Sequence, residues 1–97
     1  MDMIFSEFAD KIKKVSESLR TEMKRNLKTI DSEIEIIINA EEKNINYIEK
    51  ILDILLDYAH LSVGKKQFNK LTDYYATFNK ENAGFYKKEY DEFLKEE

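Results

Sequence analysis

Cysteine, proline and tryptophan are absent from this chain of 97 residues, and glycine occurs only at positions 64 and 84. The absence of cysteine excludes a disulfide framework and a thiolate metal cage. It also means that cysteine usage does not indicate whether the protein works in an oxidising or a reducing compartment. Because proline is absent and no glycine precedes position 64, nearly two thirds of the chain contains no strong backbone breaker. We therefore expect a helical protein.

Long apolar runs are also lacking. A helix that crosses a bilayer needs about 20 predominantly apolar residues. The most apolar stretch here, IEIIIN at residues 34–39, is short and contains an acid. No segment has the pattern of a secretion signal. We expect no membrane span, and the cytoplasm is the default location.

Charge of one sign does not accumulate along the chain. The net charge is −4, with 7 basic and 8 acidic side chains in residues 1–38, 2 and 5 in residues 39–63, and 7 and 7 in residues 64–97. Nucleic-acid binding depends on clustered Lys and Arg that displace counterions from phosphates. The sequence therefore argues against a nucleic-acid partner.

The sequence does contain enough apolar residues for one core. Hydrophobic residues make up 42% of the chain and charged residues 37%, a balance above the range typical of disorder. We expect one helical domain over residues 1–97, which buries only about 60 to 65% of its unfolded surface. Its stability is expected to be modest unless another copy or a partner adds an interface.

The first third of the chain carries a regular apolar pattern. Its apolar positions recur every three or four residues, and they are Phe5, Phe8, Ile12, Val15, Leu19, Met23, Leu27, Ile30, Ile34 and Ile37. This spacing predicts one helix over about residues 3–38, roughly 50 Å long at about 1.5 Å per residue. We call this row of apolar positions the seam. Its three consecutive steps of four residues from Val15 to Leu27 predict that the seam runs nearly straight along the helix. A helix this long must overhang a small core.

The first turn is expected where asparagine becomes frequent. The seam would need an apolar residue at position 41 and has Glu41 instead. Asn39 followed by Glu42, and Asn46 followed by Glu49, both have the pattern of a helix N-cap with an acid at the third position. The lack of glycine leaves an alternative open, in which one helix of about 60 residues runs through this region.

The second and third helices are separated at Gly64. The second, over about residues 42–63, has apolar residues around more than half of its circumference, which predicts burial on two sides. Gly64 then suits a left-handed helix C-cap. The third helix is expected over about residues 66–96. Its apolar positions rotate after Gly84, which predicts a kink or a break near that glycine.

The only histidine, His60, lies three residues after Asp57. This spacing is half of the ligand pattern of a carboxylate-bridged di-iron site, which needs a Glu-x-x-His on each of two helices and a carboxylate on each of two others. One chain supplies only one histidine, and both residues fall on the polar strip of an otherwise buried helix. We therefore interpret them as a solvent-facing or partner-facing edge, and we expect no metal site and no cofactor.

Patterns typical of enzymes are not found either. Acid pairs such as Glu33 with Glu35, or Glu41 with Glu42, have no pocket-forming composition around them, and acid–base catalysis requires a recess that shifts their pKa values. No glycine-rich loop is present to form an oxyanion hole or to hold a phosphate. The sequence predicts a protein that is not an enzyme.

Aromatic residues concentrate in the last third, since eight of the 12 lie in residues 64–97. Four residues at helical spacing are expected in the core, namely Phe68, Leu71, Tyr75 and Phe78. Five more spread over too wide an arc for one bundle face, namely Tyr74, Phe85, Tyr86, Tyr90 and Phe93. Tyrosine is favoured at protein interfaces because its ring is apolar while its hydroxyl stays hydrated. We predict that these five side chains form a partner-binding surface.

Together these patterns predict an all-α fold. We expect an antiparallel three-helix bundle, or a helical hairpin, with a long and coiled-coil-like N-terminal helix. A homodimer would cover the overhanging seam most simply. The leading functional hypothesis is a non-catalytic protein–protein interaction module: a small adaptor, immunity-type or inhibitor protein that occludes the surface of a protein partner.

Two alternatives stay open. An elongated dimer could present seven cations of the first helix to an anionic membrane surface. These cations are Lys11, Lys13, Lys14, Arg20, Lys24, Arg25 and Lys28. The acids interspersed among them are Glu7, Asp10, Glu17 and Glu22. Their presence disfavours the membrane hypothesis. The chain could also be a structural coiled-coil subunit of a larger assembly.

Overall fold

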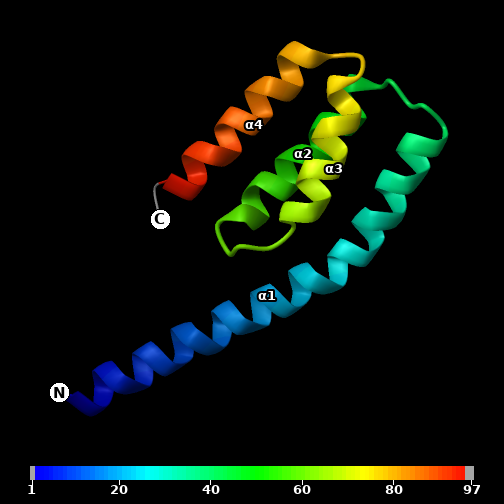
Figure 1. Cartoon of the computed structure of the whole chain (residues 1–97). Coiled ribbons are helices and arrows are strands. Elements are labelled where there is room, and N and C mark those ends of the chain that lie inside the picture. Colours follow the sequence, from blue (N-terminus) through cyan, green and yellow to red (C-terminus); the bar gives the residue numbers. More distant parts are fainter. Residues whose placement is uncertain (1, 96–97) are drawn as a thin grey trace.

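The computed structural model describes residues 2–95 and, within that range, the side chains of residues 9–94. It contains four helices: α1 (Asp2–Asn39), α2 (Ile45–Ala59), α3 (Lys65–Ala76) and α4 (Lys80–Lys95). No strand occurs in residues 2–95. The all-helical prediction is confirmed, but the chain forms four helices where the sequence predicted three (Figure 1).

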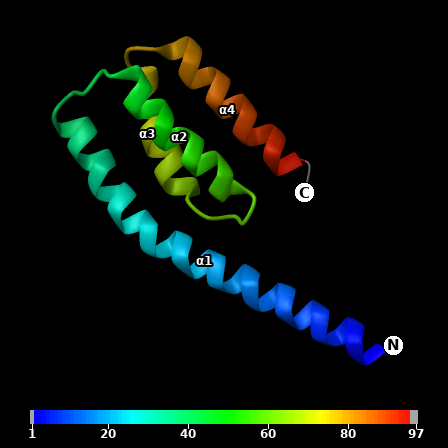
Figure 2. The same ribbon diagram turned by 180° about the vertical axis from the view of Figure 1, so that it is seen from behind.

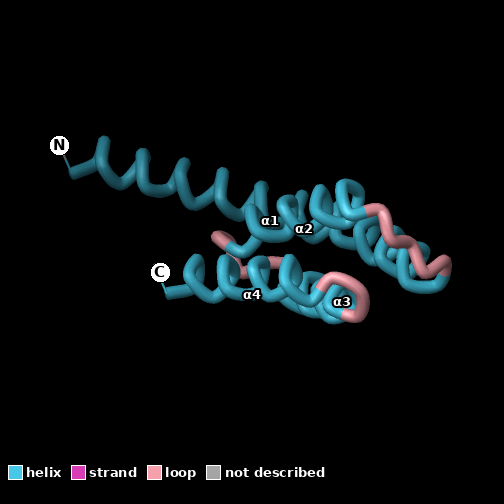
Figure 3. The backbone as a smooth tube through the Cα atoms, turned by 90° about the horizontal axis from the view of Figure 1, so that it is seen from above, coloured by secondary structure: helices cyan, strands magenta, loops and turns pink. Residues whose placement is uncertain are grey.

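Helix α3 lies at the centre of the bundle. It packs against each of the other three helices, and α2 also packs against α4. Figures 1 and 2 show α2 and α3 as an antiparallel hairpin, with the C-terminal half of α1 along one side and α4 along the other. Figure 3 shows the bundle from above as two layers, with α1 and α2 in the upper half of the picture and α3 and α4 in the lower half. Only part of α1 therefore belongs to the bundle.

The core draws on all four helices. Its largest fully buried side chains are Tyr75, Phe68, Ile34, Ile37, Ile48, Leu52, Leu55, Leu71 and Thr72. Burying one large apolar side chain contributes about 1.5–3 kcal/mol to folding. Of the four core residues predicted in the last third, three are fully buried, whereas Phe78 is partly buried against the core.

The N-terminal half of α1 projects from the bundle. The molecule measures 57 × 26 × 19 Å and its radius of gyration is 16.5 Å, against about 12.5 Å for a globular domain of this length. We call residues 9–23 of α1 the arm. The predicted seam positions Phe5 and Phe8 precede the arm and lie outside the residues whose side chains are described.

The chain reverses direction between α1 and α2, so the alternative of one continuous helix is wrong. The N-cap of α2 is Asn44, whose Oδ1 accepts a hydrogen bond of 3.1 Å from the backbone N–H of Tyr47. Glu42 Oε1 in turn accepts one of 3.0 Å from the backbone N–H of Asn44. The sequence pattern favours Asn39 and Asn46 as caps and misses Asn44, because no acid stands three positions after it.

The turn between α2 and α3 has a left-handed backbone at two positions. Helix α2 ends at Ala59 rather than near residue 63, and the chain then passes through Ser62 (φ 57°) and Gly64 (φ 90°). Gly64 thus has the predicted left-handed conformation, but it precedes α3 instead of closing α2. A Cβ atom at Gly64 would lie 3.0 Å from Leu55 Cδ2 and 3.4 Å from Leu27 Cδ2. The turn therefore packs closely on the core.

The expected break of the third helix is found, but its predicted position near Gly84 is wrong, because the chain breaks earlier, between Ala76 and Lys80. Asn79 provides the reason: its Oδ1 accepts a hydrogen bond of 3.2 Å from the backbone N–H of Asn82 and so caps the start of α4. Gly84 lies inside α4. The rotation of the apolar pattern after Gly84 reflects the buried face of a fourth helix. Residue 96, the predicted helix end, lies outside the described residues.

Candidate protein-interaction surface

The apolar seam of α1 is buried at one end and exposed at the other. In the bundle, Ile34 and Ile37 are each only 1% exposed. In the arm, the exposed fraction is 52% for Ile12, 59% for Val15 and 45% for Leu19. All five residues belong to one stripe at helical spacing. The arm therefore presents an unpaired continuation of the face that forms the core.

Helix lengths explain why the described chain does not cover the arm. Helix α1 has 38 residues, whereas α2 and α3 have 15 and 12. The turn that joins α2 and α3 lies beside Leu27, whose Cδ2 is close to Gly64. The N-terminal half of α1 extends past this turn, and no other helix runs beside it in Figures 1 and 2.

Where α1 meets the bundle, polar pairs line both edges of its seam. Toward α2, Nδ2 of Asn26 donates a hydrogen bond of 3.3 Å to the hydroxyl of Tyr58. Toward α3, Lys70 forms an ion pair with Glu35. An apolar centre with a polar rim is the usual composition of a helix interface.

The arm has the same composition. Its charged residues are Lys11, Lys13, Lys14, Arg20, Asp10, Glu17 and Glu22. Four are basic and three are acidic, so the arm has a net charge of +1. At about 100° per residue, Lys11 and Glu22 lie on one flank of the seam, about 80° and 60° from Leu19, and the other charges lie farther round the helix. The arm thus combines an apolar centre with a charged rim.

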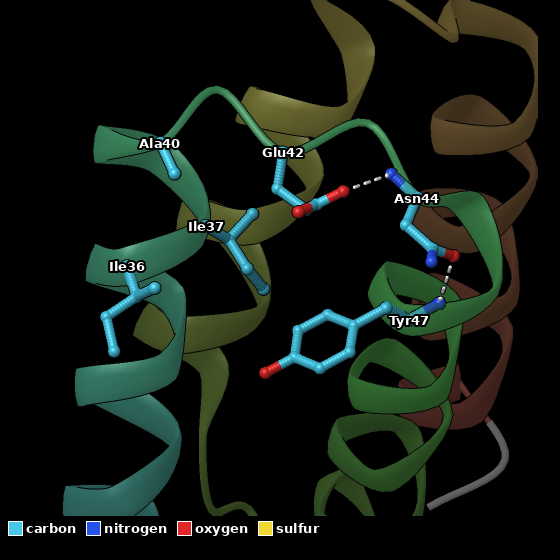
Figure 4. Close-up of a pocket in the computed structure, with 6 residues that line it drawn as sticks. All are labelled: Ile36, Ile37, Ala40, Glu42, Asn44 and Tyr47. Atoms are coloured by element: carbon cyan, nitrogen blue, oxygen red, sulfur yellow. Dashed lines mark hydrogen bonds between the residues drawn. The ribbon is translucent and has the colours of Figure 1, made fainter.

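A shallow pocket lies between the last turns of α1 and the start of α2. Its volume is about 200 Å³, and it is lined by Ile36, Ile37, Ala40, Glu42, Asn44 and Tyr47 (Figure 4). Ile36 is 66% exposed and Tyr47 is 42% exposed. Burial raises the pKa of the Tyr47 hydroxyl, and the neighbouring carboxylate of Glu33 raises it further. The pocket can accept an apolar side chain, but its lining offers no nucleophile paired with a base.

The predicted aromatic surface is only partly exposed. Phe85 is 61% exposed, while Tyr74 and Phe93 are half-buried. Tyr86 and Tyr90 are only 7% and 5% exposed and belong to the core. The expectation that all five side chains are open to a partner is therefore wrong. Their wide arc arises because α4 is a separate helix whose own face packs against α2 and α3.

Two of these aromatic residues hold α4 against its neighbours. The Tyr86 hydroxyl donates a hydrogen bond of 2.8 Å to Oδ1 of Asp53 on α2. The ring of Tyr90 stacks on that of Phe68 on α3, with 4.4 Å between the centroids. Both contacts stabilise the fold, and they leave Phe85 as the one side chain among the five predicted that is mostly exposed.

A second polar cluster lies between α2, α3 and α4. The hydroxyl of Tyr75 donates a hydrogen bond of 2.6 Å to Oε2 of Glu49, and it accepts bonds from Nδ2 of Asn79 at 3.3 Å and Nδ2 of Asn82 at 3.2 Å. Burial and the bond to Glu49 raise the pKa of Tyr75. Since every polar group of this cluster is hydrogen-bonded, we assign it a structural role.

Asp57 and His60 are both exposed, as their place on the polar strip of α2 predicts. The ring of His60 packs edge-on against Phe93, with 4.6 Å between the centroids. In the described part of the chain, no group of three or more His, Asp and Glu side chains is placed to hold a metal ion. Of the acid pairs, Glu35 forms an ion pair with Lys70.

No helix within residues 2–95 combines the length and the apolar character that crossing a bilayer requires. No protein-family model, no curated protein and no solved structure matches the chain. The surfaces of the molecule are therefore the basis for a functional proposal.

Sequence analysis missed two exposed features. It expected the first helix to overhang and a homodimer to cover its apolar residues, but it did not include Ile12, Val15 and Leu19 among the predicted partner-binding residues, although the length of the first helix relative to the others was the signal. It also missed the pocket at Ile36 and Tyr47. The signal there was that Ile36 lies about 100° from the centre of the seam, so it has to point away from the core.

Proposed function

We propose that this chain is a non-catalytic protein–protein interaction module whose arm binds by helix packing. The observation that carries the proposal is the exposure of Ile12, Val15 and Leu19 on the same face that is fully buried at Ile34 and Ile37. An exposed apolar stripe with a charged rim is characteristic of a surface that another helix covers. The module acts by occupying a partner's surface, as an adaptor, an immunity-type protein or an inhibitor does.

The composition of the arm supports a protein partner over a membrane surface. A helix that lies on an anionic membrane combines an apolar face with a strongly cationic polar face. The arm has an apolar face, but its polar side carries acids as well as cations, and its net charge is only +1. Glu22 in particular lies on the edge of the seam, where it would enter the lipid interface together with Leu19.

The test compares the full chain with two variants of the arm. Leu19→Glu places a charge in the seam, while Lys14→Glu makes a charge change on the opposite face of the same helix and serves as the matched control. Each protein is used for affinity capture from the cells that produce it, followed by mass spectrometry. A captured protein is then purified, and its binding to each variant is measured directly.

The expected result is a protein that binds the wild type and Lys14→Glu alike, with at least about tenfold weaker binding to Leu19→Glu, since a charge buried in an apolar interface is unpaired. Co-sedimentation with anionic vesicles is measured in parallel. Salt-sensitive vesicle binding that both variants weaken, with no protein bound through the arm, contradicts the proposal and supports the membrane alternative.

A further inference from the structure

We infer that the arm of a second copy of this chain covers the exposed seam, so that two arms pack antiparallel about a two-fold axis between Val15 and Leu19. The inference rests on the proposed function, because it names an occupant of the same surface. The two-fold axis makes the contact self-complementary and closed, which limits the assembly to a dimer.

The apolar residues of the arm fit an antiparallel register. The seam runs through Ile12, Val15 and Leu19, which are exposed, to Met23, which is half-buried. If Val15 faces Leu19 of the other copy, the two-fold axis sets Ile12 level with residue 22, so the apolar side chain nearest to Ile12 across the axis is Met23, one residue or about 1.5 Å farther along the helix. Each apolar side chain then meets an apolar side chain of the other copy, and the seam is covered over its whole length. The steps of four within this stretch keep it nearly straight, which suits two short helices that cross at a small angle.

The charges on the flank fit the same register. In an antiparallel helix pair, each flank faces the same flank of the other helix. Lys11 and Glu22 lie on one flank, and the register that pairs Val15 with Leu19 brings Lys11 within one residue, about 1.5 Å along the helix, of the level of Glu22 of the other copy. The two-fold axis repeats this opposite-charge pair, so it occurs twice. In a parallel pair, the same two residues would face Ser16 and Leu27, and neither charge would find a partner.

The net charge of the arm also permits self-association. Two arms of +1 each repel only weakly, because salt screens exposed charges beyond about 8 Å at physiological ionic strength. The interface is small, since one row of side chains falls below the roughly 800 Å² per partner of a stable complex. We therefore expect a weak and concentration-dependent dimer rather than an obligate one.

The first test is the molar mass of the full chain by light scattering or sedimentation. We expect a mass that rises from that of the 11.6 kDa monomer toward twice that value over about 10 to 500 μM, the range in which a small interface dissociates. Leu19→Glu should weaken the dimer at least about tenfold, and Lys14→Glu should leave it within about twofold, since Lys14 lies away from the seam.

The second test measures the direction of the helices by disulfide formation, because the chain has no cysteine of its own. Ile12→Cys and Met23→Cys are prepared separately and then mixed under oxidising conditions. An antiparallel pair gives the mixed disulfide between the two variants. Disulfides of each variant with itself, without the mixed product, overturn the proposed register.

The third test exchanges the flank charges. Lys11→Glu should weaken the dimer about threefold to tenfold, because two attractive pairs become repulsive. Adding Glu22→Lys to it should restore the affinity, whereas a purely structural effect of either substitution would add to the loss.

A chain that stays monomeric up to about 500 μM, a concentration at which even weak interfaces associate, overturns the inference. If a protein partner is then still lost on Leu19→Glu, the arm remains an interaction module and only the second copy is excluded. If anionic vesicles are the sole ligand of the arm, both this inference and the proposed function fail.

Discussion

The hydroxyl of Tyr86 lies 2.8 Å from Oδ1 of Asp53 and joins α4 to α2. Tyr86 is only 7% exposed. Burial raises the pKa of its hydroxyl, and the hydrogen bond to the Asp53 carboxylate raises it further. The folded protein therefore holds the neutral phenol, whereas the unfolded chain releases the proton near the usual tyrosine pKa of about 10.

This relationship predicts loss of stability in alkali. Below about pH 10 the phenol is protonated in both the folded and the unfolded state, so this group adds no pH dependence to the free energy of unfolding. Above that pH the unfolded chain binds fewer protons than the folded protein, and the free energy of unfolding falls by up to about 1.4 kcal/mol per pH unit for one tyrosine. Urea unfolding at a series of pH values measures this slope. The series runs from about pH 8 to about pH 11.5, which is about 1.5 units above the usual tyrosine pKa.

Tyr86→Phe is the control for the alkaline effect. It should cost about 1 kcal/mol below pH 10, through the lost hydrogen bond, because Asp53 is exposed and becomes hydrated. It should also reduce the alkaline slope. Tyr47, Tyr74 and Tyr75 have raised pKa values as well, so part of the slope remains. An unchanged slope in Tyr86→Phe would contradict the assignment.

Truncation along the seam of α1 should have opposite results at its two ends. Ile34→Ala removes a fully buried side chain and should destabilise the protein by about 2–5 kcal/mol. Ile12→Ala removes an exposed one and should change stability by less than about 0.5 kcal/mol in dilute solution. Thermal or urea unfolding at low protein concentration distinguishes the two. A large loss for Ile12→Ala would mean that the arm packs on the bundle.

The two glycines should also respond in opposite directions to alanine. Gly64→Ala forces a side chain into a left-handed backbone beside Leu55 and should cost about 1–2 kcal/mol or more. Gly84→Ala adds a methyl group to an open position inside α4 and should stabilise by about 0.5–1 kcal/mol. Unfolding midpoints of the two variants give the result. Equal losses would indicate that Gly84 is needed at a break, as the sequence had predicted.

The caps provide a fourth test. Asn44→Ala and Asn79→Ala should each destabilise by about 1 kcal/mol, because each removes the oxygen that bonds a free N–H at the start of a helix. Asn46→Ala is the matched control, since Asn46 lies within α2, and it should change stability by less than about 0.5 kcal/mol. A larger loss for Asn46→Ala than for Asn44→Ala would contradict the cap assignment.

The helical fold could be predicted because the apolar spacing is strong over a long segment. The seam from Ile12 to Ile37 has a single phase, and neither proline nor glycine interrupts it. The turns were harder to place. Asn44 and Asn79 cap their helices without an acid at the third position. The capping-box pattern therefore pointed to Asn39 and Asn46 in place of Asn44, and it gave no cap near Asn79. Gly84 resembles a helix breaker, yet an exposed helical position tolerates it at a cost of only about 1 kcal/mol.

The aromatic residues show a second limit of sequence analysis. Tyr86 and Tyr90 have the composition of an interface and also that of a core, since a tyrosine hydroxyl can bond to water or to a neighbour such as Asp53. Which of the two applies depends on how α4 packs against α2 and α3, and the cap at Asn79 fixes only where α4 begins. The periodicity of apolar residues along one helix contains no information about how that helix packs against another.

The projection of α1 beyond its neighbours has a consequence for how insertions and deletions act on the molecule. A deletion of seven residues shortens the arm by about 10 Å, and the seam then faces nearly the same direction around the helix axis. One inserted residue instead rotates the seam by about 100°. Changes of whole heptads therefore alter the reach of the arm while the bundle stays as it is, whereas a single inserted residue turns the apolar face away from whatever covers it.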